Sequence, residues 1–254
     1  MNINNILKVI YFLFFFSFNV LAGEKEDNFI NGKSLDCENC KLVGLKLKHM
    51  NLRGANLKNA DLRTTSFHRS DLFGANFDNA NLEDANLNKT ILIKASFKNA
   101  NLTNAMFFEA DMKKADLEGA QMNGVRMGKA ILNSANLTNV VSNQAFFIEA
   151  NMPKVNLTGS SFFLTLFDVA NLQNAIITDV DASKSSFYLA NMRYADLTNS
   201  KFVNTDFYKS KLLGANFTNS DFSYARFLRA NMRDVLMENT ILTNAIKPNG
   251  QIHE

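Results

Sequence analysis

The chain has 254 residues, of which 46% are hydrophobic and 20% are charged, and it contains no Trp and only two Pro. Its 27 Lys and Arg residues against 24 Asp and Glu residues give a formal net charge of +3 at pH 7. This near balance argues against a nucleic-acid binder with a concentrated basic face, and against a strongly acidic mimic of DNA.

The first 22 residues have the pattern of a signal peptide. Lys8 ends a short polar start, residues 9–18 form an apolar run, and Ala22 ends the segment after two further apolar residues. The apolar run is about half as long as the roughly 20 residues that a membrane-spanning helix needs. We therefore expect cleavage after Ala22 and export through Sec to a periplasm or out of the cell. The alternative is that the segment stays uncleaved as a membrane anchor, which is the only membrane contact we expect.

Residues 23–39 precede the regular part of the chain and are expected to form an N-terminal cap. Cys37 lies in this segment, and Cys40 follows it. In the register of the repeat described below, both side chains point inward. An exported protein can join such a pair in a local disulfide that closes the first coil. The alternatives are a redox-active Cys-x-x-Cys motif, which usually lies at a helix start after a strand, and a zinc site, which needs further ligands.

A large apolar residue recurs at every fifth position from Leu42 to Leu242. Of the 41 positions in this register, 39 hold Leu, Phe, Met or Ile, and the exceptions are Ser142 and Ala182. From Ala55 to Ala245 the residue two positions before each centre is Ala, Ser, Thr or Val, and Asn or Asp usually stands between them. A period of five fits neither the helical repeat of about 3.6 residues nor the alternation of a strand. We therefore predict a coil whose pentads form the sides of a square, with the centre and the small residue pointing inward.

These pentads, such as Ala55-Asn56-Leu57, resemble the motif of the pentapeptide-repeat family over nearly all of residues 40–245. The resemblance implies an all-β fold, a right-handed quadrilateral parallel β-helix with four pentads in each coil. About ten coils at roughly 4.8 Å each would make a rod about 50 Å long. One interior column is then predicted to be a stack of aromatic rings. Its members are Phe107, Met127, Phe147, Phe167, Phe187, Phe207 and Phe227.

The register breaks at Lys247, so residues 246–254 are expected to form a C-terminal tail. A solenoid has to cover the core of its last coil. The short tail or a second copy of the chain is expected to do so.

No group of residues has the pattern of a catalytic or metal-binding site. The three histidines, His49, His68 and His253, are far apart in the coil and stand beside no nucleophile. The sequence has neither of the Gly-rich motifs that bind phosphates or dinucleotides. Acidic neighbours such as Glu83 and Asp84 lie on a convex rod without a concave site. We therefore expect no enzymatic activity, no cofactor and no metal.

The face that carries the predicted Phe column also holds many apolar residues at its outward positions, and two residues at the edge of the preceding face extend them. We call this set the apolar stripe. Its members are Met106, Phe108, Phe146, Ile148, Phe163, Leu164, Leu166, Tyr188, Tyr208 and Leu228. Clustered exposed aromatic residues are typical of contact sites between proteins, although scattered apolar residues are common on any surface. The stripe is the candidate site for an unidentified protein partner or for a homodimer, which an end coil could also form.

Basic residues in the first coils are spread over different faces, which favours a solvated surface over nucleic-acid binding. They are Lys46, Lys48, Arg53, Lys58 and Arg63. The sequence therefore favours a non-catalytic exported scaffold that presents a surface for protein–protein interaction. The alternative, implied by the resemblance, is a DNA mimic that protects gyrase or topoisomerase, as some family members do. The signal peptide and the near-neutral charge argue against it.

Overall fold

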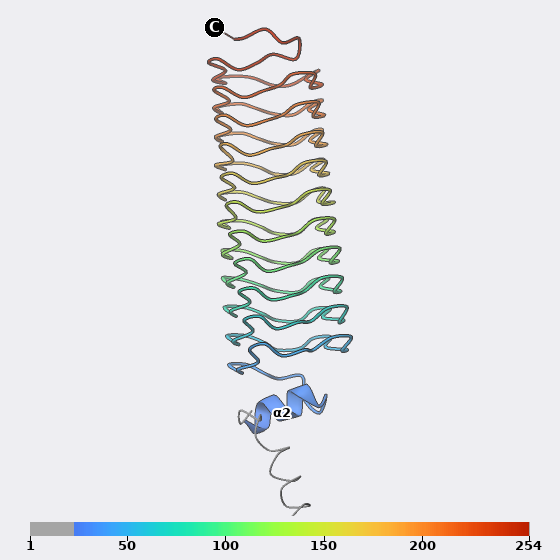
Figure 1. Ribbon diagram of the computed structural model, residues 1–254. Coiled ribbons are helices and arrows are strands. Elements are labelled where there is room, and N and C mark those ends of the chain that lie inside the picture. The colour runs from blue at the N-terminus through green and yellow to red at the C-terminus, as the bar shows by residue number, and fades with distance from the viewer. Residues whose placement is uncertain (1–22, 254) are drawn as a thin grey trace, which may run out of the picture.

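The computed structural model describes residues 23–253, which form a straight rod of stacked coils with a short helix across its N-terminal end (Figure 1). Helix α2 (Glu24–Ile30) is the one helix within this range. Isolated parallel bridges connect the rest of the described chain: every fifth residue pairs with the residue 20 positions later, from Asp36–Asn56 to Arg226–Ile246. The predicted all-β right-handed quadrilateral β-helix is confirmed. The expected signal peptide at 1–22 lies outside the described residues, and none of the helices within them is long and apolar enough to cross a membrane.

Nearly all pentads share one local structure, which explains their residue preferences. The residue before the centre forms the bridge, and two turn residues follow the centre. An Asn or Asp at the bridge position accepts the N–H of the first turn residue, as Asn76 Oδ1 does from Asp78 at 2.8 Å. The second turn residue has a positive φ, such as 58° at Asn79. Asn and Gly are common there because they adopt this left-handed conformation at low cost.

Backbone hydrogen bonds connect each coil to the next one. The N–H of the centre Phe97 donates to the carbonyl of Asp116 at 2.7 Å, and the N–H of Asp116 donates to the carbonyl of Ala95 at 3.0 Å. Because this pattern repeats on all four sides, the sides of the rod present side chains and no free strand edge. A partner that approaches a side must therefore recognise side chains.

The interior is filled by the centres and the small residues, as the sequence predicts. Phe147, Phe167, Phe187, Phe207 and Phe227 stack with their rings nearly parallel and their centroids 4.8–5.2 Å apart. All of these rings are buried. The predicted interior stack is thus confirmed from Phe147 onward. Below it, Met127 separates the stack from Phe107, whose ring packs edge-on against Phe97 at 5.9 Å.

The N-terminal cap is helix α2, which lies across the first coil. Phe29 is fully buried and Ile30 packs beside it against the core. The Glu26 carboxylate accepts the N–H of Lys41 at 3.1 Å. The first coil begins at Asp36, four residues before the expected start of the repeat at 40.

The C-terminal end is only partly covered. Parallel pairing continues to Ile246, after which the chain turns back and Ile246 pairs with Ile252 in antiparallel fashion. The N–H of His253 donates to the carbonyl of Ala245 at 2.8 Å. Leu236 in the last coil nevertheless stays 60% exposed. The tail therefore closes one part of the last coil and leaves apolar side chains in contact with solvent.

Candidate protein-interaction surface

Four residues of the apolar stripe come together around an open hollow of about 530 Å³. Phe108 and Phe146 line it and are 38% and 39% exposed, and Met106 and Ile148 complete its apolar wall. The remaining lining residues are Asn88, Arg126 and Gly128. We call this hollow the Gly128 groove.

A missing side chain makes the floor of the Gly128 groove. Phe108, Gly128 and Ile148 follow one another at intervals of 20 residues, so they occupy one outward column in successive coils. A Cβ atom at Gly128 would lie 3.5 Å from the Phe108 ring and 3.6 Å from the carbonyl of Ile148. The absence of a side chain between two large apolar ones leaves the notch in which another molecule's side chain could rest.

Two ion pairs run along one edge of the groove. Lys89 and Glu109 are 3.3 Å apart, and Lys129 and Glu149 are 3.6 Å apart. All four side chains occupy the second turn position, where successive coils alternate in charge. The edge is therefore neutral overall, and the interior of the groove carries one cation, Arg126.

The upper part of the apolar stripe is more polar than the groove. Tyr188 and Tyr208 stack with centroids 5.8 Å apart, and the charged groups of Lys209 and Arg226 each lie 5.1 Å from the Tyr208 ring. Leu228 lies beside Gly250 of the tail, 3.6 Å from the position that a Cβ atom would take there. The stripe is thus divided into the groove and a tyrosine pair.

Leu166 and two residues of the preceding face connect these parts. Leu166 is half-buried and forms a bridge with Phe146 in the coil below. Phe163 is half-buried beneath the Lys184 ammonium at 5.3 Å, and Leu164 is exposed beside it. The structure therefore places all ten predicted stripe residues at outward positions, and the exposed Phe108 and Phe146 lie at the groove.

Sequence reasoning missed Val169 and Leu189, which extend the apolar surface from the second turn position. Val169 is 49% exposed at a φ of 61°, and Leu189 is exposed at a φ of 56°. Reading every fifth residue of this third outward column would have found them. Arg126 and Gly128 were missed for a different reason, because only large apolar residues were sought. A β-branched residue with positive φ is strained, and such strain is often found at functional sites.

The other candidate residues are the two cysteines and the histidines. Cys37 and Cys40 are joined in a disulfide and both are buried beneath the cap. The expectation that the three histidines lie far apart is wrong for two of them, because the His49 and His68 rings pack edge to face with their centroids 6.2 Å apart. Within residues 23–253 no group of three or more His, Cys, Asp or Glu side chains is arranged to hold a metal.

The basic residues of the first coils do not form a continuous patch. Arg53 pairs with Asp71 at 2.9 Å, and Arg63 pairs with Asp61 at 2.7 Å. Hydrogen bonds from the Arg63 guanidinium are the main cause that lowers the pKa of the Asp61 carboxyl. Two of the five predicted basic residues are thus neutralised by acidic neighbours.

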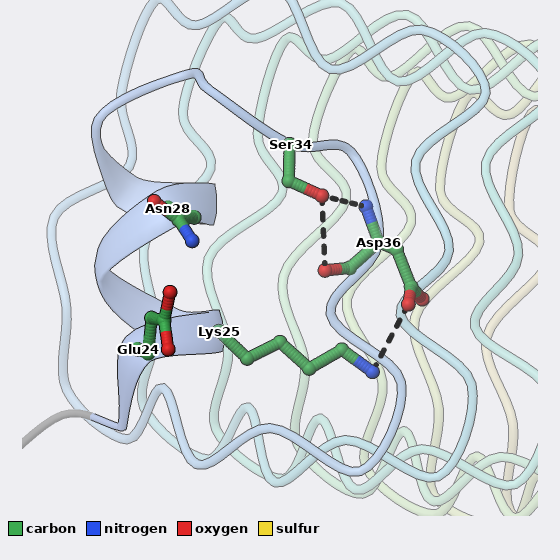
Figure 2. Close-up of a pocket in the computed structure, with 5 residues that line it drawn as sticks. All are labelled: Glu24, Lys25, Asn28, Ser34 and Asp36. Carbon is green, nitrogen blue, oxygen red and sulfur yellow. Dashed lines mark hydrogen bonds and ion pairs between the residues drawn. The ribbon is translucent and has the colours of Figure 1, made fainter.

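A second hollow, of about 480 Å³, lies where the cap meets the first coil (Figure 2). Lys25 pairs with Asp36 at 3.1 Å and donates to the carbonyl of Glu38 at 2.9 Å, while Ser34 Oγ accepts the N–H of Asp36 at 3.0 Å. The hydrogen bond from Lys25 is the main cause that lowers the pKa of Asp36. These groups bind one another and hold α2 on the rod, which makes this hollow a structural feature of the cap.

A family model described as pentapeptide repeats matches 8 copies of its motif, over residues 36–69, 70–107, 130–168, 165–202 and 200–239. No curated protein matches the sequence. Among solved structures, this chain is similar to HetL, a pentapeptide repeat protein involved in regulation of heterocyst differentiation in the cyanobacterium Nostoc sp. strain PCC 7120. The identity is 22%, the match covers 89% of this chain and 97% of HetL, and the TM-score is 0.46.

Two further solved structures are similar to parts of the chain. Trypsin-treated QnrB1, a plasmid-mediated fluoroquinolone resistance protein, is 21% identical, with 72% of this chain and 89% of that chain covered and a TM-score of 0.33. A pentapeptide repeat protein from the thylakoid lumen of Arabidopsis thaliana is 23% identical, with 40% and 71% covered and a TM-score of 0.31.

Proposed function

The chain belongs to the pentapeptide-repeat family, and from this premise we propose that it is a non-catalytic scaffold that binds a protein partner through the apolar stripe. The observation that carries the proposal is the Gly128 groove, where Phe108 and Phe146 are exposed side by side with Met106 and Ile148. Contiguous exposed apolar side chains around a hollow are typical of protein contact sites.

The strained turn residues beside the groove support the same function. Val169 and Leu189 occupy the left-handed turn position that Asn, Gly or Lys fills in most other pentads. A left-handed conformation costs a residue with a side chain about 1–2 kcal/mol, and a β-branched residue is the worst case. Neither side chain belongs to the core, so we infer that binding offsets this cost.

We also propose that the protein works outside the cytoplasm, in a periplasm or beyond the cell. The signal-peptide pattern of residues 1–22 supports export. The Cys37–Cys40 disulfide supports it independently, because disulfides persist mainly in oxidising compartments.

The experiment is affinity capture from envelope and secreted fractions with the chain from Gly23 onward, followed by titration of the purified partner. The test variant replaces Phe146, Ile148 and Leu166 together with Asp. We expect partner affinity to fall by at least about 30-fold, since interface hot spots contribute about 2 kcal/mol or more.

The matched control carries three Asp substitutions at Asn156, Thr158 and Ile176, which are shifted by ten residues and so lie on the opposite face at the same height. This control is expected to bind like the unmodified chain, and circular dichroism of both variants should match it. If the stripe variant binds its partner with unchanged affinity, the proposal is wrong.

A second copy of the chain is a further candidate partner, at the last coil. Leu236 and Ile241 are exposed there, and the N–H groups of Met232, Met237 and Leu242 donate to no acceptor within the described chain. In the coils below, the equivalent N–H groups donate to the next coil. Sedimentation equilibrium should therefore show a dimer that Met237→Lys with Ile241→Lys converts to a monomer, whereas a monomeric unmodified chain would exclude this contact.

Protection of gyrase by DNA mimicry is the less supported function. A DNA mimic needs an extended acidic surface, and this chain has a net charge of +3 and an alternating charge pattern beside the groove. We expect the protein to leave gyrase supercoiling unchanged. Inhibition or rescue of supercoiling at micromolar protein would reverse this assignment.

A further inference from the structure

Arg126 is the one cation inside the Gly128 groove, and its surroundings are unusual for an arginine. Its bridges to Met106 in the coil below and Phe146 in the coil above place it between two apolar side chains, each about 4.8 Å away along the rod. Arg126 is exposed and forms no ion pair with any residue that the structure describes. The groove therefore offers an unpaired guanidinium within an apolar wall.

Arg226 shows what the same column does when a carboxylate is available. It lies five coils above Arg126, and its guanidinium binds Asp206 in the coil below through both Nε and Nη2. This contact is the main cause that raises the pKa of Arg226. At Arg126 the residue in the coil below is Met106, which has no carboxylate.

The notch at Gly128 lies in the next column of the same coil as Arg126. It is bounded below by the Phe108 ring and above by Ile148. An apolar side chain inserted there would contact both. A group two residues away on the same segment would lie within reach of Arg126, because Arg126 and Gly128 are themselves two residues apart.

The charges around the groove favour a ligand group with a single negative charge over a group with several negative charges. Lys89 and Lys129 are already paired with Glu109 and Glu149, and these two carboxylates face the same side of the rod. A phosphate or a nucleic-acid backbone would meet repulsion from them and only one free cation. A carboxylate matches the planar guanidinium in charge and in geometry.

We propose that the Gly128 groove binds a segment of a partner protein in which a large apolar side chain lies within two residues of an Asp or Glu. The apolar side chain fills the notch between Phe108 and Ile148, and the carboxylate pairs with Arg126. This inference rests on the proposed function of the apolar stripe. It specifies the partner's chemistry, because the sides of the rod offer no free strand edge and recognition must proceed through side chains.

The test is selection of random peptides displayed on phage against the chain from Gly23 onward. We expect enriched peptides to combine a large apolar residue with a nearby Asp or Glu. Binding of a synthesised peptide, measured by fluorescence anisotropy, should weaken by at least about tenfold with Arg126→Glu. Replacing the peptide's acidic residue with Lys should restore binding to Arg126→Glu.

Two further variants control for position and for shape. Arg226→Ala removes the paired arginine of the same column and should change the affinity by less than about twofold. Gly128→Leu places a Cβ atom at ordinary contact distances and fills the notch with a side chain, so it should weaken binding by at least about tenfold without altering the circular dichroism.

Different outcomes of the peptide experiment would contradict this inference and the proposed function. Peptides that bind the stripe without an acidic residue, or whose affinity Arg126→Glu leaves unchanged, would overturn the pairing with Arg126 and leave the stripe as a contact site. If no peptide binds the unmodified chain better than the variant with Asp at positions 146, 148 and 166, both proposals fail. Self-association of the chain through the groove would also overturn this inference, because the groove would then bind a second copy of the chain and not an acidic segment of another protein.

Discussion

Val169 is a residue whose side chain is unfavourable in the backbone conformation that its position in the pentad requires. Its φ of 61° suits Asn or Gly, yet its side chain is β-branched and 49% exposed. The side chain gains little from burial, so the conformational cost is not repaid within the rod. Stability and surface chemistry therefore make opposite demands at this residue.

Val169→Asn is expected to raise the free energy of unfolding by about 1 kcal/mol, because Asn adopts positive φ at lower cost. Urea denaturation followed by circular dichroism measures this change. The reverse substitution Asn139→Val, at the same turn position on another face, is expected to lower the stability by a similar amount. Destabilisation by Val169→Asn would show that the valine side chain makes contacts more important than its strain.

His68 reports the local electrostatics of the first coils. Its partial burial, followed by the charges of Arg69 and the facing His49, lowers the pKa of the His68 imidazole below its ordinary value of about 6.5. A group whose pKa is lowered in the folded state stabilises the fold above the unfolded-state pKa, and this contribution is lost as the pH falls through the folded-state pKa.

An NMR titration should give His68 a midpoint below 6.5, and Arg69→Gln should raise it, because a positive charge disfavours the imidazolium. Stability should fall slightly as the pH is lowered below about 6.5, and His68→Gln should reduce that fall. A His68 midpoint above 6.5 would mean that an acidic group outweighs both the partial burial of His68 and the charge of Arg69.

In the interior Phe column, the residues that the five-residue repeat places inward also stack closely on one another. Phe187 lies 4.8 Å from Phe167 and 5.2 Å from Phe207, and it also packs edge-on against Phe202 at 6.0 Å. Because each coil from Phe147 to Phe227 contributes one ring, a cavity at one level removes contacts with the levels above and below.

Phe187→Ala is therefore expected to lower the free energy of unfolding by about 3–5 kcal/mol. Phe187→Leu should cost clearly less, because Leu is the commonest centre residue of the repeat and fills more of the space. Chemical denaturation of the two variants measures both costs. Equal losses would indicate that ring stacking, and not filled volume, determines the stability of this column.

The elements differ in how far the sequence predicts them. The period of five determines which side chains point inward, and the period of 20 determines which residues share a column, so the core and the membership of the stripe could be read directly. Helix α2 could not be foreseen, since its 7 residues carry no repeat and its position depends on Phe29 contacting the first coil. The groove depends on contacts between coils. The difference between Arg126 and Arg226 is visible in sequence only when each is compared with the residue 20 positions earlier.

At the scale of the whole molecule, each coil contacts only the coils directly above and below it, apart from the ends. Stability should then be close to a sum of contributions from coils and their interfaces. The bridges at intervals of 20 residues mean that removing one whole coil keeps every remaining residue in its column.

Deletion of residues 60–79 is expected to give a folded rod that is one coil shorter, with a smaller denaturant m-value and lower stability. Circular dichroism and urea denaturation test this, and the Gly128 groove should keep its affinity for selected peptides. A control that removes residues 60–64 alone rotates the N-terminal cap by one side relative to the groove. Complete unfolding after loss of the single coil would show that stability is concentrated in the first coils.

Because every coil has the same rise, the number of coils between two surface sites determines the distance between them. The Gly128 groove at Ile148 and the tyrosine pair at Tyr188 lie on one face, two coils and hence about 10 Å apart. Gain or loss of a coil between them would change this separation in steps of about 4.8 Å without turning either site to another face. A rod of this kind can therefore hold two binding sites at one of a series of fixed distances, and this distance does not depend on what each site binds.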